Sequence, residues 1–185
     1  IAAGVESMTR VPMGLPATLP FKHGFGSYMS RAMQARYPNV QFSQFAGAEM
    51  LAVKYDLAKD ELDDYALRSH QRASEATRGA YFGAEILPLP VRTTEGAATN
   101  DTHATDEGIR FDATREGIGA VKLLHESGRH TAATASQICD GAAALLVVNE
   151  RGLKLLGAST KPLARVHQMT VLGHDPVIML EAPIP

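Results

Sequence analysis

The sequence has no tryptophan, a single cysteine and only 6% aromatic residues in a chain of 185. One cysteine excludes an intramolecular disulfide framework, and no CxxC motif or Cys/His cluster of the kind that binds zinc is present. There is also no large excess of either charge, with 18 Lys+Arg against 20 Asp+Glu. This balance argues against a nucleic-acid-binding protein, because such proteins usually carry a clear basic excess. We expect reducing, intracellular surroundings, with the cytoplasm as the default location.

Long apolar runs are missing as well. The longest, residues 142–148, is far too short to span a bilayer, and no segment has the pattern of a signal peptide. The 45% hydrophobic and 21% charged residues are typical of a globular protein. The chain starts at Ile1 rather than a methionine and stops after a Pro-Ile-Pro sequence, so we expect a piece of a longer protein.

Periodicity and turn residues predict an α/β protein with helices and loops inserted before its main strands. Ser43 is expected to cap a helix, and Gly79 to end the clearest helix, whose first turn is acidic. Helices are expected over 28–37, 43–54, 60–78 and 151–156, with a further helical end to 110–124. Strands are expected over 1–5, 86–91, 142–148 and 163–171, and loops over 9–26 and 93–108.

Taken alone, the chemistry-bearing residues are few. The chain has no GxGxxG, phosphate-binding loop or GxSxG motif. Cys139 stands beside an aspartate and next to an apolar strand, so a small buried residue is favoured over a reactive thiol, which needs an electropositive, exposed site. The acidic run 60–64 is interpreted as the solvated start of a helix rather than a metal or acid–base site. His174, on a glycine turn, is either a catalytic histidine or part of a strand-ending turn.

Several segments together resemble the thiolase family. Residues 4–14 (GVESMTRVPMG) are similar to the family's GGVESMSRxPMG segment. Residues 131–150 (TAATASQICDGAAALLVVNE) carry the most specific likeness, to TAxNASxxxDGAAAxxLxSE, and residues 175–185 are similar to VDPxxMxxxPIP. The remaining matching segments, in the same order as in the family, are 47–52, 59–67, 69–73 and 106–110.

The resemblance implies a thiolase-like layered α/β fold of two similar halves, with a long loop region inserted in the first. Residues 1–8 then end a core strand of the N-terminal half, and 9–130 form the inserted loop or lid domain. Residues 131–157 supply the last strand and helix of that half, and 158–185 begin the C-terminal half. The insertion is expected to cover the substrate and to contribute to a homodimer or homotetramer.

For site residues the resemblance implies coenzyme A contacts but no catalytic group. Arg110 corresponds to an arginine near the adenine nucleotide, where a guanidinium stacks on a base or pairs with phosphate. Ser136 corresponds to a serine on the pantetheine arm, and Ala132 and Ala133 are small enough for the arm to pass. An ordinary surface arginine and a helix-capping serine stay as the alternatives.

The family's nucleophilic cysteine lies upstream of residue 1, and its catalytic histidine and acid–base cysteine lie downstream of residue 185. Cys139 and His174 fall at other, non-catalytic places, so the strand-ending turn is preferred for His174. Two departures are visible. Thr134 replaces the family's asparagine and is expected to loosen that turn, and Ser43-Gln44 stand near the place of a His-Met pair of the short-chain biosynthetic members.

The implied function is that of an acyl-CoA C-acyltransferase in fatty acid metabolism, acting in β-oxidation on longer or bulkier chains. It cleaves 3-ketoacyl-CoA with coenzyme A to acetyl-CoA and a shortened acyl-CoA, or runs the reverse condensation, through an acyl-cysteine. Coenzyme A is then a co-substrate, and no other cofactor, metal, nucleic acid or membrane span is expected. The alternatives are a non-catalytic thiolase-like acyl-CoA-binding protein, or a complete 185-residue chain that buries residues 142–148 poorly.

Overall fold

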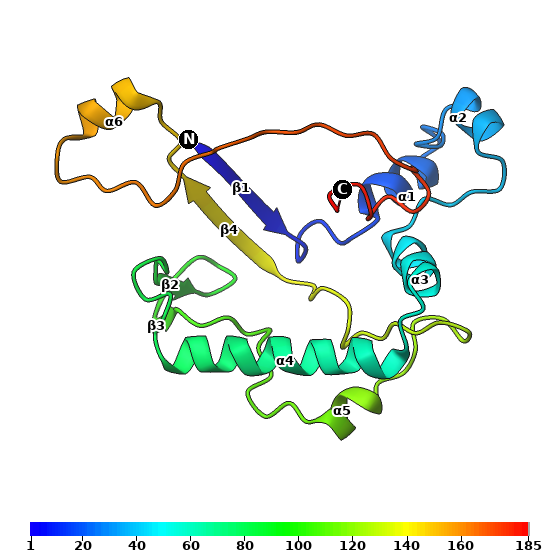
Figure 1. Ribbon diagram of the computed structural model, residues 1–185, viewed down its shortest axis with the longest axis horizontal. Coiled ribbons are helices and arrows are strands. Elements are labelled where there is room, and N and C mark those ends of the chain that lie inside the picture. The colour runs from blue at the N-terminus through cyan, green and yellow to red at the C-terminus, as the bar shows by residue number, and fades with distance from the viewer. Residues whose placement is uncertain (185) are drawn as a thin grey trace. The chain divides into compact units, whose positions relative to one another are not determined.

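The computed structural model describes residues 1–184 (Figure 1). The chain divides into two compact units. The first contains Ile1–Gly47 and the residues from Ile138 onward, and the second contains Ala48–Gln137. No helix among the described residues is both long and apolar enough to cross a membrane.

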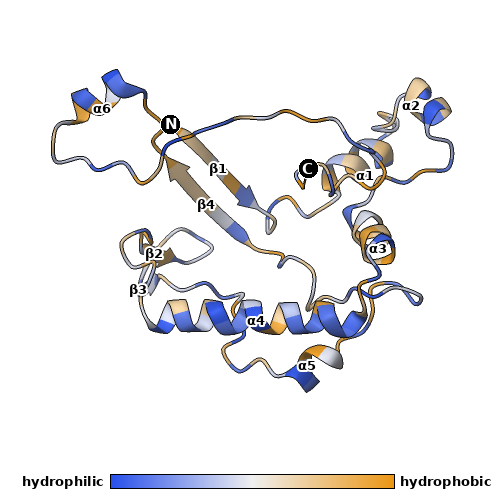
Figure 2. Cartoon of the chain, viewed as in Figure 1, coloured by the Kyte–Doolittle hydropathy of each residue, from blue (hydrophilic) through white to orange (hydrophobic). Residues whose placement is uncertain are grey.

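An antiparallel pair of strands organises the first unit. Strand β1 (Ala2–Ser7) pairs with β4 (Asp140–Leu145) in a continuous register from Ala2 opposite Leu145 to Ser7 opposite Asp140. Both strands were predicted, but the prediction that the apolar one is buried on both faces is wrong for the described chain. Its residues are exposed, because no helix among residues 1–184 packs on this two-stranded ribbon. Figure 2 shows the apolar colouring of both strands.

Helices of the first unit follow local signals. Helix α1 (Leu15–Lys22) lies where a loop was expected, because its Pro16 falls in the first turn, where proline is tolerated. Helix α2 (Arg31–Arg36) was predicted and is capped by the Ser30 hydroxyl, which accepts a hydrogen bond from the Met33 N–H at 3.2 Å.

Two further predictions in this unit have opposite outcomes. Helix α6 (Glu150–Leu156) is confirmed; the Asn149 side chain caps it and Gly157, at φ 91°, ends it. The strand expected over 163–171 is wrong. This segment has no regular secondary structure and pairs with no strand in the described part of the chain, and a strand needs a partner for its backbone hydrogen bonds.

Three helices belong to the second unit in whole or part. Helix α3 (Gln44–Lys54) begins after Ser43, as predicted, and the Ser43 hydroxyl accepts a weak 3.5 Å bond from the Ala46 N–H. Helix α4 (Lys59–Arg78) is also confirmed, and the short α5 (Arg115–Gly119) packs against it. α4 is coloured largely hydrophilic in Figure 2.

The buried face of α4 agrees only in part with the stripe that its spacing predicts, which contains Leu62, Tyr65, Ala66, Ser69 and Ala73. Ala66 is buried as expected, whereas Tyr65 is 70% exposed and Ser69 is exposed. The buried residues are Asp63, Ala66 and Ser74, which share one face at spacings of three and eight. The helix therefore packs through small and polar side chains.

A β-hairpin completes the second unit. Strand β2 (Leu89–Arg92) pairs antiparallel with β3 (Ala98–His103), with an irregularity between Pro90 and Arg92. The loop prediction over 93–108 is therefore wrong for β3. That strand is polar and lacks an apolar alternation, so it is held by backbone pairing and by the bond from Thr99 Oγ1 to the Val91 carbonyl at 2.8 Å.

Candidate functional site

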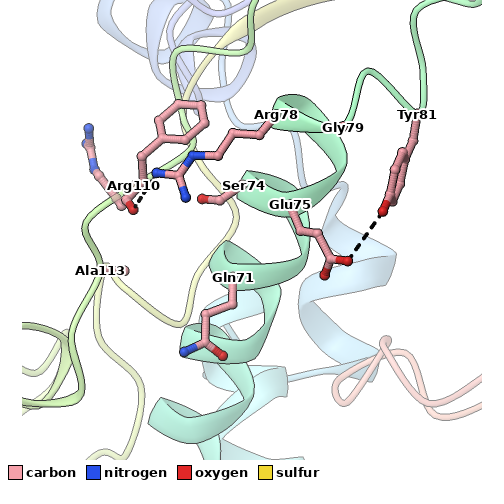
Figure 3. A pocket seen from close by; sticks show the side chains of 9 residues that line it. Gln71, Ser74, Glu75, Arg78, Gly79, Tyr81, Arg110 and Ala113 are labelled. Carbon is pink, nitrogen blue, oxygen red and sulfur yellow. Dashed lines mark hydrogen bonds between the residues drawn. The ribbon is translucent and has the colours of Figure 1, made fainter.

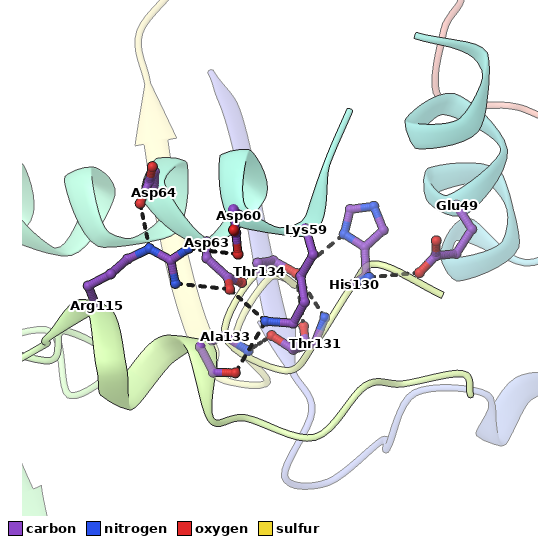
Figure 4. Close-up of polar contacts among 11 residues, drawn as sticks. Glu49, Lys59, Asp60, Asp63, Asp64, Arg115, His130, Thr131, Ala133 and Thr134 are labelled. Carbon is purple, nitrogen blue, oxygen red and sulfur yellow. Dashed lines mark hydrogen bonds and ion pairs between the residues drawn. The ribbon is translucent and has the colours of Figure 1, made fainter. Parts of the chain in front are cut away.

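A tight turn forms the segment that precedes Ser136 (Figure 4). Thr131 is completely buried, and its hydroxyl accepts a hydrogen bond from the Ala133 N–H at 3.1 Å. The Thr134 hydroxyl accepts from the Thr131 N–H at 2.9 Å. The N–H groups of Thr134 and Ala135 both donate to the Thr131 carbonyl at 3.1 Å. The Thr134 hydroxyl, at the place of the family's asparagine, thus closes this turn.

Glu49 and Arg129 join this turn to helix α3. Both carboxylate oxygens of Glu49 accept from the backbone N–H of Arg129 at 2.9 Å, and Oε1 also accepts from the backbone N–H of His130 at 2.8 Å. In return, Arg129 Nη1 donates to the carbonyl oxygens of Ala52 at 2.6 Å and Leu57 at 2.8 Å. Reciprocal hydrogen bonds thus connect the turn with the C-terminal half of α3.

A second link connects the turn with the segment that carries Arg110. Gln137 directly follows Ser136, and its amide Nε2 lies 3.4 Å from the Asp106 Oδ1 atom. The same Asp106 oxygen accepts from the Gly108 N–H at 2.7 Å. The Gln137 amide occupies the space that a Cβ at Gly108 would take, so an alanine there would displace this amide from Asp106. Two segments about 30 residues apart in sequence are therefore held side by side.

The predicted contact residues lie in two places. Ala132 and Ser136 are exposed and Ala133 is half-buried, all within the same turn and its extension. Arg110 is exposed, and its backbone N–H donates to His70 Nδ1 on α4 at 3.2 Å. The structure thus groups the two alanines with the serine, while Arg110 is positioned by α4.

Arg110 lines an open pocket of about 500 Å³ at the C-terminal half of α4 (Figure 3). The Arg78 guanidinium stands over the Phe111 ring at 5.5 Å. The Ser74 hydroxyl is buried with no hydrogen-bond partner among the described residues. The remaining lining residues are Gln71, Glu75, Gly79, Tyr81 and Ala113. The Arg78 guanidinium and the Phe111 ring suit a ligand with anionic and planar parts, although the Glu75 carboxylate shares the lining and the Arg110 side chain points away from α4 in Figure 3.

An ion cluster anchors α5 to the first turns of α4 (Figure 4). Asp63 Oδ2 lies 2.5 Å from Lys59 Nζ and 3.3 Å from Arg115 Nη1. Arg115 also contacts Asp60 at 2.9 Å and Asp64 at 2.6 Å. Hydrogen bonding to Asp60, and then to Asp64, raises the pKa of the Arg115 guanidinium. The interpretation of residues 60–64 as a purely solvated helix start is therefore wrong at Asp63, which is fully buried.

Cys139 and His174 lie in the first unit. Cys139 is exposed, so the prediction of a buried residue is wrong; the strand that it precedes is uncovered in the described chain. His174 Nε2 lies 3.6 Å from Glu181 Oε2, in a segment of turns and extended backbone. Among residues 1–184, no three His, Cys, Asp or Glu side chains lie close enough together to hold a metal ion.

Comparison with known proteins defines the class of this chain. Residues 1–151 match the family described as "Thiolase, N-terminal domain". The chain belongs to the thiolase family, as its sequence motifs predicted. The similarity extends to solved structures. Human mitochondrial 3-ketoacyl-CoA thiolase in complex with CoA is 28% identical with a TM-score of 0.60, over 83% of this chain and 38% of that one. The predicted thiolase-like α/β fold is confirmed.

Individual relatives are 3-ketoacyl-CoA thiolases. The steroid 3-ketoacyl-CoA thiolase FadA6 of Mycobacterium tuberculosis is 38% identical over 187 residues, covering 100% of this chain and 44% of that protein. A 3-ketoacyl-CoA thiolase of Aliivibrio fischeri is 36% identical over 189 residues, covering 100% and 45%. The chain thus spans less than half the length of these relatives.

Proposed function

We propose that this chain contributes to an acyl-CoA C-acyltransferase that cleaves 3-ketoacyl-CoA with coenzyme A. A cysteine thiolate attacks the 3-keto carbonyl carbon, the bond between C2 and C3 breaks, and C2 takes a proton as acetyl-CoA leaves. The thiol of a second coenzyme A then attacks the acyl-cysteine, which releases a shortened acyl-CoA and restores the thiol. Splitting one carbon–carbon cleavage into two acyl transfers lowers the barrier to each. The reverse condensation uses the same steps.

The single observation that carries this proposal is the thiolase match over residues 1–151. The geometry supports it, because the two motif segments, 106–110 and 131–137, are joined through Gln137 and Asp106. We place none of the reacting groups within the 185 residues. In this proposal the chain supplies binding and orientation of coenzyme A.

Each contact residue has a defined part in the proposal. Arg110, at the pocket beside α4, meets the adenine-nucleotide end of coenzyme A by stacking or phosphate pairing. The exposed Ser136 hydroxyl bonds to a polar group of the pantetheine arm. Ala132 and Ala133 leave room for the arm to approach the backbone of the turn.

A longer or bulkier acyl chain is the proposed substrate class. Two observations support it: the absence, near Ser43-Gln44, of the His-Met pair of the short-chain biosynthetic members, and the similarity to a steroid 3-ketoacyl-CoA thiolase. We also propose a homodimer or homotetramer. The 27% identical peroxisomal thiolase of Saccharomyces cerevisiae, with a TM-score of 0.55 over 76% of this chain and 33% of that one, is dimeric.

Thiolysis of 3-ketoacyl-CoA esters of graded length by the full-length protein tests the activity. We expect Ser136→Ala to raise KM for coenzyme A about threefold to tenfold with a smaller change in kcat, because one hydrogen bond to the ligand is lost. Ser69→Ala, at an exposed position on α4, is the matched control and leaves both constants unchanged. An unchanged KM in Ser136→Ala contradicts the assignment.

The alternative is a thiolase-like protein that binds acyl-CoA without turnover. The two functions differ in one result. Formation of acetyl-CoA supports the enzyme, whereas saturable binding of coenzyme A with no acetyl-CoA formed supports the binding protein.

A further inference from the structure

The turn at residues 129–136 is placed by contacts with other segments, one of which is the bond from the Leu124 N–H to the His130 carbonyl at 2.9 Å. Its internal hydrogen bonds join Thr131 with Ala133, Thr134 and Ala135, which shapes the turn but does not place it relative to the helices. Ala132 and Ser136 are exposed. The contacts that place the turn against a helix are those that Glu49 and Arg129 make with α3.

We propose that Glu49 and Arg129 are positioning residues that fix this turn for binding of coenzyme A. The proposal rests on the function proposed above. Glu49 accepts two backbone N–H groups from the start of the turn, and Arg129 returns two bonds to carbonyl oxygens of Ala52 and Leu57. Hydrogen bonds with one charged partner are about twice as strong as neutral ones. At the helix end, Arg129 adds a second donor to the Ala52 carbonyl, which already accepts from the Leu57 N–H at 2.8 Å.

Close approach of the turn to Glu49 gives independent support. A Cβ built on Gly128 would lie 2.5 Å from Glu49 Oε1 and 3.1 Å from the His125 carbonyl oxygen. A side chain at residue 128 would therefore force the Glu49 carboxylate to move from the position in which it accepts from the N–H groups of residues 129 and 130. Gly128→Ala therefore disturbs the contact between the Glu49 carboxylate and the turn, while Glu49 and Arg129 both stay unchanged.

The functional consequence is preorganisation. A binding group works when it is held within about 0.5 Å of its productive position by surrounding contacts. If the turn were mobile in the free protein, binding of coenzyme A would have to order it. The entropic cost of this ordering would weaken the affinity for coenzyme A. Glu49 and Arg129 fix the turn before the ligand arrives, so their loss weakens binding of coenzyme A without removing any atom that touches it.

Binding of coenzyme A to the full-length protein, measured by isothermal titration calorimetry, tests the proposal. We expect Glu49→Ala to weaken binding at least tenfold, because two charge-assisted bonds are lost. Glu49→Gln keeps one acceptor oxygen and the shape of the side chain, so it retains most of the affinity, with a loss of about threefold. Gly128→Ala is expected to fall between them. Glu126→Ala, which removes an exposed carboxylate close by, is the matched control and changes the affinity less than twofold.

Two further readouts separate positioning from a general structural effect. Hydrogen exchange at the amides of Arg129 and His130 is expected to speed up in Glu49→Ala without bound ligand. In thiolysis, KM for coenzyme A rises while kcat changes less. If Glu49→Ala and Glu126→Ala bind coenzyme A with equal affinity although the amides of Arg129 and His130 exchange faster in Glu49→Ala, the positioning role is overturned. The proposed function would not be affected by that result. Absence of coenzyme A binding by the unmodified protein overturns the proposed function itself.

Discussion

Asp63 offers the most discriminating test of how the second unit is held together. Its side chain is fully buried, and Oδ2 is shared by Lys59 Nζ at 2.5 Å and Arg115 Nη1 at 3.3 Å. Asp63→Asn keeps the shape but removes the charge that both cations face. The side chains of Lys59 and Arg115 are 29% and 33% exposed, so water compensates part of the loss.

The magnitude follows from these contacts. Losing the charge of a hydrogen-bonded partner costs about 1.5–3 kcal/mol. A central value of about 2 kcal/mol corresponds to a change of about 30-fold in an opening equilibrium. Asp64 is the matched control, because it contacts the same Arg115, through Nε at 2.6 Å, but is 59% exposed. Asp64→Asn is expected to cost less than about 1 kcal/mol, as exposed ion pairs do.

Hydrogen exchange read by mass spectrometry measures the effect where it arises. Helix α5 packs on α4, so its release exposes the amides of Arg115–Gly119. We expect protection of the hydrogen-bonded amides of Gly117, Ile118 and Ala120 to fall about 30-fold in Asp63→Asn and by less than about fivefold in Asp64→Asn. Added salt reduces the Asp64 effect more than the Asp63 effect, because exposed charges are screened. Equal losses in the two variants, or a larger loss in Asp64→Asn, refute the reasoning.

Two predictions concern the first unit. Hydrogen bonds from the Thr9 N–H and hydroxyl lower the pKa of the Asp140 carboxyl. The ionised carboxylate therefore stabilises the fold at any pH above the ordinary aspartate pKa. This stabilisation is lost as the pH falls through the lowered pKa of the folded state. Carboxyl NMR titration is expected to show Thr9→Val raising this pKa part of the way to normal, and no change would contradict it. Gly47→Ala places a Cβ against the Ile178 carbonyl oxygen, whereas the space around Gly141 is open. In thermal unfolding we expect Gly47→Ala to lower Tm by about 3–8 °C and Gly141→Ala much less; equal shifts would show that the contact is unimportant.

The sequence predicted the elements that are determined locally. Ser43 and Gly79 were predicted to mark helix ends, and in the structure α3 begins directly after Ser43 and α4 ends directly before Gly79. The strand expected over 163–171 depends on a partner strand, which no pattern within the segment can supply. Helix α1 was missed because its prolines were taken as signs of a loop, although one of them falls in the first turn.

The candidate site shows the same division between local and distant information. Its motif segments were found from sequence, but the contacts that hold them were not. Arg115 is 52 residues from Asp63, and Arg129 is 80 residues from Glu49, so neither pairing leaves a periodic signal. The acidic run in α4 was visible, yet only the fold decides that Asp63 is buried while Asp64 is exposed. The contact of Gln137 with Asp106 had no signal in the sequence other than the position of Gln137 next to Ser136.

A crystal structure of the full-length protein with bound coenzyme A tests the central claim most directly. We predict one coenzyme A molecule whose adenine-nucleotide end contacts Arg110 and whose pantetheine arm accepts or donates a hydrogen bond at Ser136. The Glu49 and Arg129 bonds are predicted to be the same with and without the ligand. Coenzyme A bound away from both Arg110 and Ser136 would contradict the account.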